Sequence, residues 1–310
     1  MLSLLLSIFT FVQLNCENLF DYMHDAGKSD TEFTPEGSYR WTKTRYWRKL
    51  DRTGQAILSC SGADGTCLPD MAVLCEVEND TVMRDLTKRS LLRGARYEYV
   101  MTDSPDSRGI DVALLYSPFS FRLLASHSVR VPLVGAMRPT RDILYVKGLV
   151  ESGDTLHVVA VHFPSRRGGE KLSQPFRRQA VDCLCGLVDS INVSSPNARI
   201  VVAGDFNMYS GERLMRQVLG HGLVDVSSQA RGQNGARGTY RYQGRWGSLD
   251  HILVSTSYAK DVKSCFVNDA AFLTEKDEKY GGIKPRRNFL GPVFRNGFSD
   301  HLPLVCRFEW

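Results

Sequence analysis

Residues 198–211 read ARIVVAGDFNMYSG, an apolar run that predicts a buried strand and that ends at Asp205, Phe206 and Asn207. Successive strand side chains point to opposite faces, so we expect Asp205 and Asn207 on one side and Phe206 in the core. Gly, Asp and Asn are also the ordinary residues of a turn, so GDFN alone fits a simple chain reversal equally well. The rest of the chain has to decide between a turn and a site.

Polar residues stand at the ends of other apolar segments in the same way. A lone Asp or His in such a place is most often a turn or surface residue. Several of them together supply carboxylates, an amide and two imidazoles at strand ends, where α/β scaffolds assemble their sites. The segments FVQLN, MAVLCEVEN, VVAVHF, LDHILVS and GFSDHLPLV contribute Asn15, Glu76, His162, Asp250, Asp300 and His301.

Short apolar segments alternate with loops and with two amphipathic helices, predicted at about 43–59 and 174–191. Several segments are apolar throughout, which is typical of strands buried on both faces. We therefore predict an α/β fold of sheets covered by helices. Because no repeat, low-complexity tract or linker interrupts the chain, we predict one domain over residues 1–310.

The composition is that of a globular enzyme: 310 residues, 43% hydrophobic and 24% charged. Lys and Arg number 39 against 34 Asp and Glu, a net charge of +5, and most of the basic residues are Arg. Arg forms two-pronged contacts with phosphate, which favours a phosphate-bearing substrate. Since no apolar run approaches the roughly 20 residues that span a bilayer, we expect no integral membrane association.

The first residues, MLSLLLSIFTF, resemble the core of a signal peptide but lack its basic start and small-residue cleavage site. Lipoprotein-like cleavage at Cys16 would also remove Asn15. We therefore expect residues 9–14 to form a first buried strand, and the compartment stays open: cytoplasmic, or exported through a signal further upstream.

The eight cysteines do not have the spacing of metal ligands and are expected to be mainly buried thiols. Cys60 and Cys67, around the segment SGADGT, are the pair best placed for a local disulfide.

The order and spacing of the motifs resemble the endonuclease/exonuclease/phosphatase superfamily of metal-dependent phosphoesterases. The match spans nearly the whole chain, through LNCEN, LCEVEN, VHFPS, GDFN, LDHILVS and SDHLPL. The resemblance implies a four-layer α/β sandwich, with two mixed sheets packed face to face and helices outside. It also implies hydrolysis of phosphate esters with a divalent metal ion.

That chemistry accounts for the residue types. A hard cation has to neutralise the phosphate oxygens, and Mg²⁺, which Mn²⁺ can replace, is held by a few carboxylates and several waters. Glu76 matches the family motif and is the expected metal ligand, with Asn15 beside it and Asp300 as a further ligand. Glu78 would share the face of Glu76 if the strand continued, and is a secondary candidate.

The resemblance and the chemistry together suggest the remaining roles. Asp205 is expected to orient or deprotonate the attacking water, and Asn207 to hold a phosphate oxygen. Family mechanisms differ over whether the Asp or the His is the base, and we expect Asp205 to be the base and His301 to bind the phosphate.

Four more residues follow from the resemblance. Asp300 is expected to orient the His301 ring, His162 to be the general acid, and Asp250 to support His162 or a second metal. His162 points to the deoxyribonuclease-like and sphingomyelinase-like branches, because the abasic-site repair branch carries Asp there. Arg108 matches a family position near the phosphate.

Basic loops beside the motifs are candidate substrate contacts. RGTYRYQGRWG alternates Arg241 and Arg245 with aromatic residues, a combination that suits a nucleic-acid backbone and stacked bases. SRRGGEK adds Arg166 and Arg167, and IKPRRNFLG adds further arginines ahead of Asp300. Solvated loop charge is the alternative interpretation of all of them.

We therefore expect a monomeric, Mg²⁺-dependent phosphodiesterase whose partner is nucleic acid. The alternatives are a phosphomonoesterase or a sphingomyelinase-like phospholipid phosphodiesterase on the same scaffold. A noncatalytic binding protein would have lost parts of the constellation, yet every matched position carries a chemically competent residue.

Overall fold

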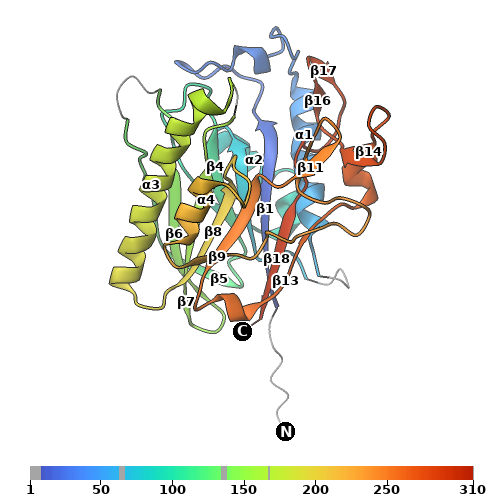
Figure 1. The fold of residues 1–310 in the computed structure, drawn as a ribbon. Helices are drawn as coiled ribbons and strands as arrows, with labels where there is room; N and C mark the ends of the chain where they lie inside the picture. Colours follow the sequence, from blue (N-terminus) through green and yellow to red (C-terminus); the bar gives the residue numbers. More distant parts are fainter. Residues whose placement is uncertain (1–7, 63–66, 134–137, 167, 310) are drawn as a thin grey trace.

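The structure, a computed structural model, describes residues 8–62, 67–133, 138–166 and 168–309. Two six-stranded sheets pack face to face, with helices on their outer sides (Figure 1). The predicted four-layer α/β sandwich is therefore confirmed.

Each large sheet mixes parallel and antiparallel neighbours: β1 is parallel to β2, and β7 is parallel to β8. The first sheet has the order β13 (Val262–Val267), β18 (Leu304–Glu309), β1 (Ile8–Leu19), β2 (Met71–Val77), β4 (Asp111–Tyr116), β3 (Glu98–Met101). The second has the order β5 (Phe121–Val129), β6 (Ile143–Val150), β7 (Thr155–His162), β8 (Arg199–Asp205), β12 (Asp250–Ser255), β9 (Leu223–Asp225). Two-stranded hairpins pair β10 (Tyr240–Tyr242) with β11 (Arg245–Gly247), β14 (Thr274–Lys276) with β15 (Ile283–Pro285), and β16 (Phe289–Leu290) with β17 (Val293–Phe294).

The central strands are apolar throughout because both of their faces are covered. On β7, Val158 and Ala160 belong to the core between the two sheets, whereas Val159 and Val161 pack in a second core with residues of α3 (Glu170–Ser194). The same division holds on β8, where Val201 faces inward and Val202 outward. Continuous burial of this kind gives the apolar runs seen in the sequence.

The helices cover the outer faces (Figure 1). The first predicted helix is α1 (Lys43–Leu58), which starts after the N-cap residue Thr42, and the second is α3, which extends beyond the predicted segment at both ends. Pro175 lies in the second turn of α3, and because Pro is typical of the first turn of a helix, the sequence predicts a later start. The helices α2 (Asp80–Lys88) and α4 (Arg213–Leu219) were not predicted, because so few residues give little periodic signal. Short 3₁₀ turns lie at Thr31–Phe33, Leu91–Ala95, Ala259–Asp261 and Ala271–Leu273.

Irregular backbone ends β1 and β2 at the same edge of the first sheet. The register between them shifts between Asn15 and Leu19, and the register of β2 with β4 shifts at Glu76. Glu17, Asn18 and Glu76 all have left-handed φ angles of 51°, 56° and 62°. Bulges re-aim side chains locally. Glu76 and Glu78 therefore do not share a face as simple strand alternation predicted, and Glu78 bonds instead to the backbone N–H of Asp21.

Two further expectations can be compared with the structure. Cys60 is a buried free thiol that donates to the carbonyl oxygen of Ala56, so the local disulfide with Cys67 is not formed in this structure. None of the helices in the described ranges is long and apolar enough to cross a membrane.

Gly204, next to Asp205, provides a test of the packing between β7 and β8. Its φ is +152°, and a Cβ there would lie 1.8 Å from the carbonyl oxygen of Val161. Gly204→Ala should therefore lower the free energy of unfolding by about 3 kcal/mol, as overpacking does in cores. Chemical denaturation measures this effect, with Gly211→Ala as the control, since a Cβ at Gly211 meets no atom within 4 Å. Equal stability of the two variants would contradict the packing described.

Candidate active site

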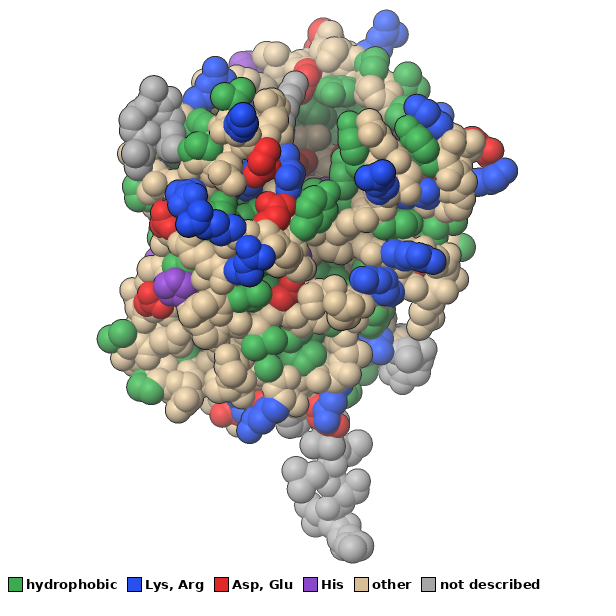
Figure 2. Space-filling view, in the orientation of Figure 1, with side chains coloured by type: hydrophobic (Ala, Val, Ile, Leu, Met, Phe, Trp, Pro, Cys, Tyr) green, Lys and Arg blue, Asp and Glu red, His purple; other side chains and the backbone are tan. Residues whose placement is uncertain are grey.

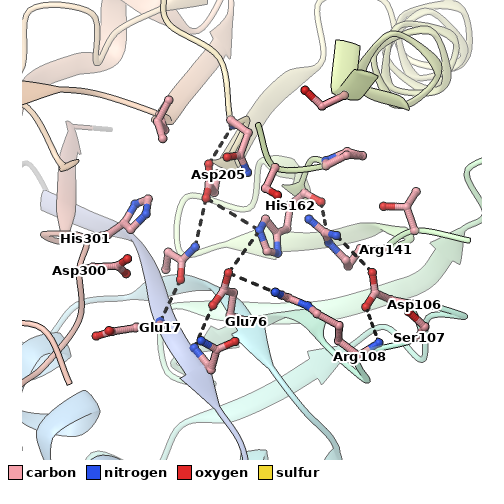
Figure 3. Close-up of a pocket in the computed structure, with 18 of the residues that line it drawn as sticks. Glu17, Glu76, Asp106, Ser107, Arg108, Arg141, His162, Asp205, Asp300 and His301 are labelled. Atoms are coloured by element: carbon pink, nitrogen blue, oxygen red, sulfur yellow. Dashed lines mark hydrogen bonds and ion pairs between the residues drawn. The ribbon is translucent and has the colours of Figure 1, made fainter. Parts of the chain in front are cut away.

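A pocket of about 780 Å³ opens where the ends of the strands in the two sheets meet. The upper part of the molecule is hollowed there, with acidic and basic side chains close to the opening (Figure 2), and Figure 3 shows the lining residues. Eight predicted site residues line it: Asn15, Glu76, Arg108, His162, Asp205, Asn207, Asp300 and His301. Asp250 is fully buried and lies behind His301.

Three of the predicted residues form a row across the second sheet. His162 is the last residue of β7, Asp205 is the last of β8, and Asp250 is the first of β12. The strand register pairs His162 with Asp205, and Asp205 with Asp250. Sheet pairing therefore sets the spacing of these side chains.

Hydrogen bonds link this row to β1 in the opposite sheet. Asn15 Nδ2 donates to Asp205 Oδ2 at 3.1 Å, and Gln13 Nε2 donates to Asp250 Oδ1 at 3.0 Å. All four side chains are buried. The site is thus held together between the sheets as well as within each of them.

The GDFN segment is both a turn and part of the site. Strand β8 ends at Asp205, and the N–H of Asn207 donates to Asp205 Oδ1 at 2.8 Å, while Asn207 has a φ of 51°. Asn207 Nδ2 donates to the carbonyl oxygen of Phe163, and Phe206 is buried against the Phe163 ring. Asp205 and Asn207 therefore both reach the pocket, as predicted, but through a tight turn and not through the alternation of side chains along a strand.

The partner of the His301 ring differs from the one expected. His301 Nδ1 lies 2.7 Å from Asp250 Oδ2, and Thr239 Oγ1 donates to the same carboxylate. Asp300 instead bonds to Arg287, with Nη2 and Oδ2 3.0 Å apart. Asp250 thus orients His301, which corrects both the role expected for Asp300 and the support of His162 expected from Asp250. Asp300 is the sequence neighbour of His301, but β12 brings Asp250 to the ring.

The surroundings shift the pKa values of Asp205 and His301. Burial and the charge of Asp250 raise the pKa of Asp205 to about 7, although His301 opposes the shift. Burial disfavours a charged His301, but Asp250, Asp300 and Asp205 outweigh it and raise the pKa of the ring well above its usual value. The pocket therefore combines an imidazolium with a carboxylate that can exchange a proton near neutral pH.

The pKa of His162 is shifted in the opposite direction to that of His301. Burial, followed by the charges of Arg141 and Arg108, holds its pKa well below the usual value. Its Nε2 lies 3.8 Å from both Glu76 Oε1 and Asp205 Oδ2, and within the described ranges its buried Nδ1 has no hydrogen-bond partner. A neutral ring can donate one hydrogen bond, and the general-acid role expected for His162 stays a prediction.

Glu76 lines the pocket, and its two carboxylate oxygens differ in their partners. Its Oε2 accepts a hydrogen bond from the N–H of Asn18 at 2.9 Å, but Oε1 accepts none from the part of the chain that the structure describes. His162 Nε2 lies 3.8 Å from Oε1, and the nearest cationic group, the guanidinium of Arg108, lies 3.9 Å from it. An unsatisfied carboxylate oxygen facing a pocket fits a hard divalent ion.

Asp205, Asp250 and His301 form a second group of possible metal ligands, with one donor atom of each within 4.8 Å of the others. His301 Nδ1, however, is already hydrogen-bonded to Asp250, and a protonated imidazole offers no lone pair. The metal site expected at Glu76, with Asn15 beside it, stays a prediction.

Arg141 is a site residue that the sequence did not reveal. Its buried guanidinium donates to the carbonyl oxygens of His162 and Phe163 and bonds to Asp106 Oδ2 at 3.2 Å. Asp106 Oδ1 in turn accepts the N–H of Arg108. The only sequence signal was a charge directly ahead of a buried strand, in TRDILYV, and many surface residues share that signal.

Of the other predicted substrate contacts, Arg287 lines the pocket, whereas Arg166, Arg241 and Arg245 lie outside its lining. Arg241 donates to the carbonyl oxygens of Gly281 and Ile283, so its side chain is 7% exposed and holds the β14–β15 hairpin. Arg245 is exposed elsewhere, and Arg166 pairs with Glu170 and Glu212. Arg167 lies outside the described residues. Backbone carbonyls thus accept from the guanidinium of Arg241, and its contact with a substrate stays a prediction.

Asp250→Asn should lower the pKa of the His301 ring, because it removes a charge that stabilises the imidazolium while the ring stays buried. NMR titration of the histidine rings measures the shift. Asp225→Asn is a matched control, since Asp225 holds the buried His251 ring in a similar pair at 3.0 Å, and this change should move the pKa of His251 alone. An unchanged pKa of His301 in Asp250→Asn would refute the assigned pairing.

Comparison with known proteins agrees with this geometry. Three similar solved structures are a mannosyl-6-phosphatase of Bacteroides thetaiotaomicron (16% identity, TM-score 0.63), the human nocturnin catalytic domain with a bound sulfate anion (20%, 0.57) and a truncated TDP2 of Caenorhabditis elegans (15%, 0.57). The matches cover 96%, 98% and 98% of this chain and 98%, 97% and 98% of those chains, respectively. At these identities the likeness concerns the fold.

A search of curated protein sequences gave no match. A family model described as the endonuclease/exonuclease/phosphatase family matches residues 10–309, which is nearly the whole chain. The match includes every strand end that carries a residue of the pocket. The chain therefore belongs to the endonuclease/exonuclease/phosphatase family.

Proposed function

We propose that the protein is a Mg²⁺-dependent phosphoester hydrolase. The observation that carries this proposal is the unsatisfied Glu76 Oε1 in the same pocket as a carboxylate with a pKa of about 7 and an imidazolium. Glu76 and Asn15 would hold the ion, which neutralises charge on the phosphate when it is bound. Mn²⁺, with similar oxygen preferences, would substitute for it.

Three side chains of the pocket would activate the water and bind the phosphate. Asp205, held by hydrogen bonds from Asn15 and from the Asn207 N–H, would orient a water and accept its proton. His301, held as an imidazolium by Asp250, would bond to a phosphate oxygen. Arg108 lies at the pocket near Glu76 and can contact another phosphate oxygen.

The two candidate substrate classes are nucleic acid and smaller phosphate esters. The abundance of Arg favours phosphodiester bonds in nucleic acid, as the sequence suggested. A smaller phosphate ester is favoured by a specific observation: Arg241 and Arg245 do not line the pocket. On the face shown in Figure 2, Lys and Arg side chains are scattered instead of gathered in one stripe, which gives a long polyanion no single basic track there.

A substrate panel tests this proposal. Plasmid DNA, single-stranded DNA, RNA, bis(p-nitrophenyl) phosphate, p-nitrophenyl phosphate and sphingomyelin would be assayed with Mg²⁺, with Mn²⁺ and in excess chelator. We expect hydrolysis only with metal. Glu76→Gln should need at least about 100-fold more Mg²⁺ for half-maximal rate, because loss of a mere supporting partner already costs 10–100-fold in affinity.

Full activity in excess chelator would contradict the metal-dependent mechanism. Cleavage of the polynucleotides at far lower concentrations than the small esters would establish a nuclease. The reverse preference would make the protein a small-molecule phosphatase.

A further inference from the structure

Arg287 lies between two carboxylates on one side of the pocket. Its Nη2 is 3.0 Å from Asp300 Oδ2 and its Nε is 3.3 Å from Glu17 Oε1. The Arg287 side chain lines the pocket and is 39% exposed, whereas that of Glu17 is 5% exposed. An arginine stays charged at any physiological pH. This side of the pocket therefore already contains a cation supplied by the chain itself.

The position of Arg287 is fixed by its own loop. Glu17 also accepts hydrogen bonds from the backbone N–H groups of Asn288 and Phe289, the two residues after Arg287. The Phe289 ring is buried and packs against Trp41, with the ring centres 5.6 Å apart. The loop is thus bound to β1 on one side and to an aromatic cluster on the other, so the guanidinium cannot readily move away from Asp300.

Within the part of the chain that the structure describes, Glu76, unlike Asp300 and Glu17, has no close arginine partner. Its Oε1 accepts no hydrogen bond from the described residues, and Arg108 remains 3.9 Å away. In Figure 3, Glu17 and Asp300 lie on one side of the site, and Arg108 lies beyond Glu76 on the other. The pocket therefore has one carboxylate open to a divalent ion and, apart from it, a carboxylate pair already neutralised in part by Arg287.

We propose that Arg287 is a built-in cation that limits this site to one divalent ion, held at Glu76. The inference rests on the proposed metal dependence and refines it. Asp300, which the family resemblance suggested as a metal ligand, instead holds Arg287 in place. A second divalent ion near Asp300 would have to displace the guanidinium or lie beside a like charge, and both are unfavourable. Without the guanidinium, Asp300 and Glu17 would attract an ion.

Counting bound Mn²⁺ tests the inference without any assay of activity. Equilibrium dialysis, with free Mn²⁺ measured by electron paramagnetic resonance, gives the number of ions per chain for the wild type and each variant. Relative to the wild type, Glu76→Gln should bind one ion fewer and Arg287→Met one ion more. Arg287→Lys keeps the charge and should match the wild type. Asp300→Asn should also match it.

Arg286→Met is the matched control. Arg286 is the neighbouring residue of the same loop, but its guanidinium lies over the Phe298 ring and outside the pocket lining, so this variant should bind as many ions as the wild type. Ions held by the separate acidic group of Asp25, Asp30 and Glu78 would add equally to every count and cancel in the differences.

The outcomes separate the two claims. An unchanged count in Glu76→Gln would overturn the proposed metal dependence at Glu76, and with it this inference. A loss of one ion in Glu76→Gln, together with no gain in Arg287→Met or with a loss in Asp300→Asn, would overturn the role of Arg287 alone. Circular dichroism confirms that each variant is folded, and the Asp300→Asn count decides the question if Arg287→Met is not.

Discussion

The hydrogen bond from Asn15 Nδ2 to Asp205 Oδ2 joins strand ends that belong to different sheets. With the parallel bond from Gln13 to Asp250, it places polar pairs inside an otherwise apolar sandwich. A buried polar group left without a partner costs about 1–3 kcal/mol, so the two sheets are held in the one alignment that satisfies both pairs. That alignment brings Glu76 and Asp205, carried by different sheets, to one pocket. It also explains why the polar ends of buried strands are not surface turns.

The backbone at the site is irregular where the chemistry is concentrated. Glu17, Asn18, Glu76 and Asn207 all have left-handed φ angles, which cost free energy for residues other than glycine. Local hydrogen bonds hold several of them: the N–H of Glu17 bonds to Asn15 Oδ1, and that of Asn18 to Glu76 Oε2. The sandwich thus supports a strained but fixed arrangement, as a preorganised electrostatic site requires.

Much of this could be predicted from the sequence. Apolar runs covered on both faces indicated the sandwich, and the order of polar residues at strand ends indicated which side chains meet. The partners of those side chains could not be predicted. The pairing of His301 with Asp250, in place of Asp300, depends on where β12 begins relative to a loop about fifty residues later. Likewise, Arg241 and Arg287 look alike in sequence, but the first is bound to backbone carbonyls and the second to two carboxylates of the pocket.

The central claim is that Asp205 and His301 act on the same phosphate group of the substrate. It is tested most directly by a double-mutant cycle on phosphoester hydrolysis with Asp205→Ala, His301→Ala and the double variant, each checked for folding. Each single variant should lose about 10²–10³-fold or more in kcat/KM. The double variant should lose no more than about tenfold beyond the worse single variant, because residues that serve one transition state are not additive. Strictly additive losses would show that Asp205 and His301 act independently and would contradict the account.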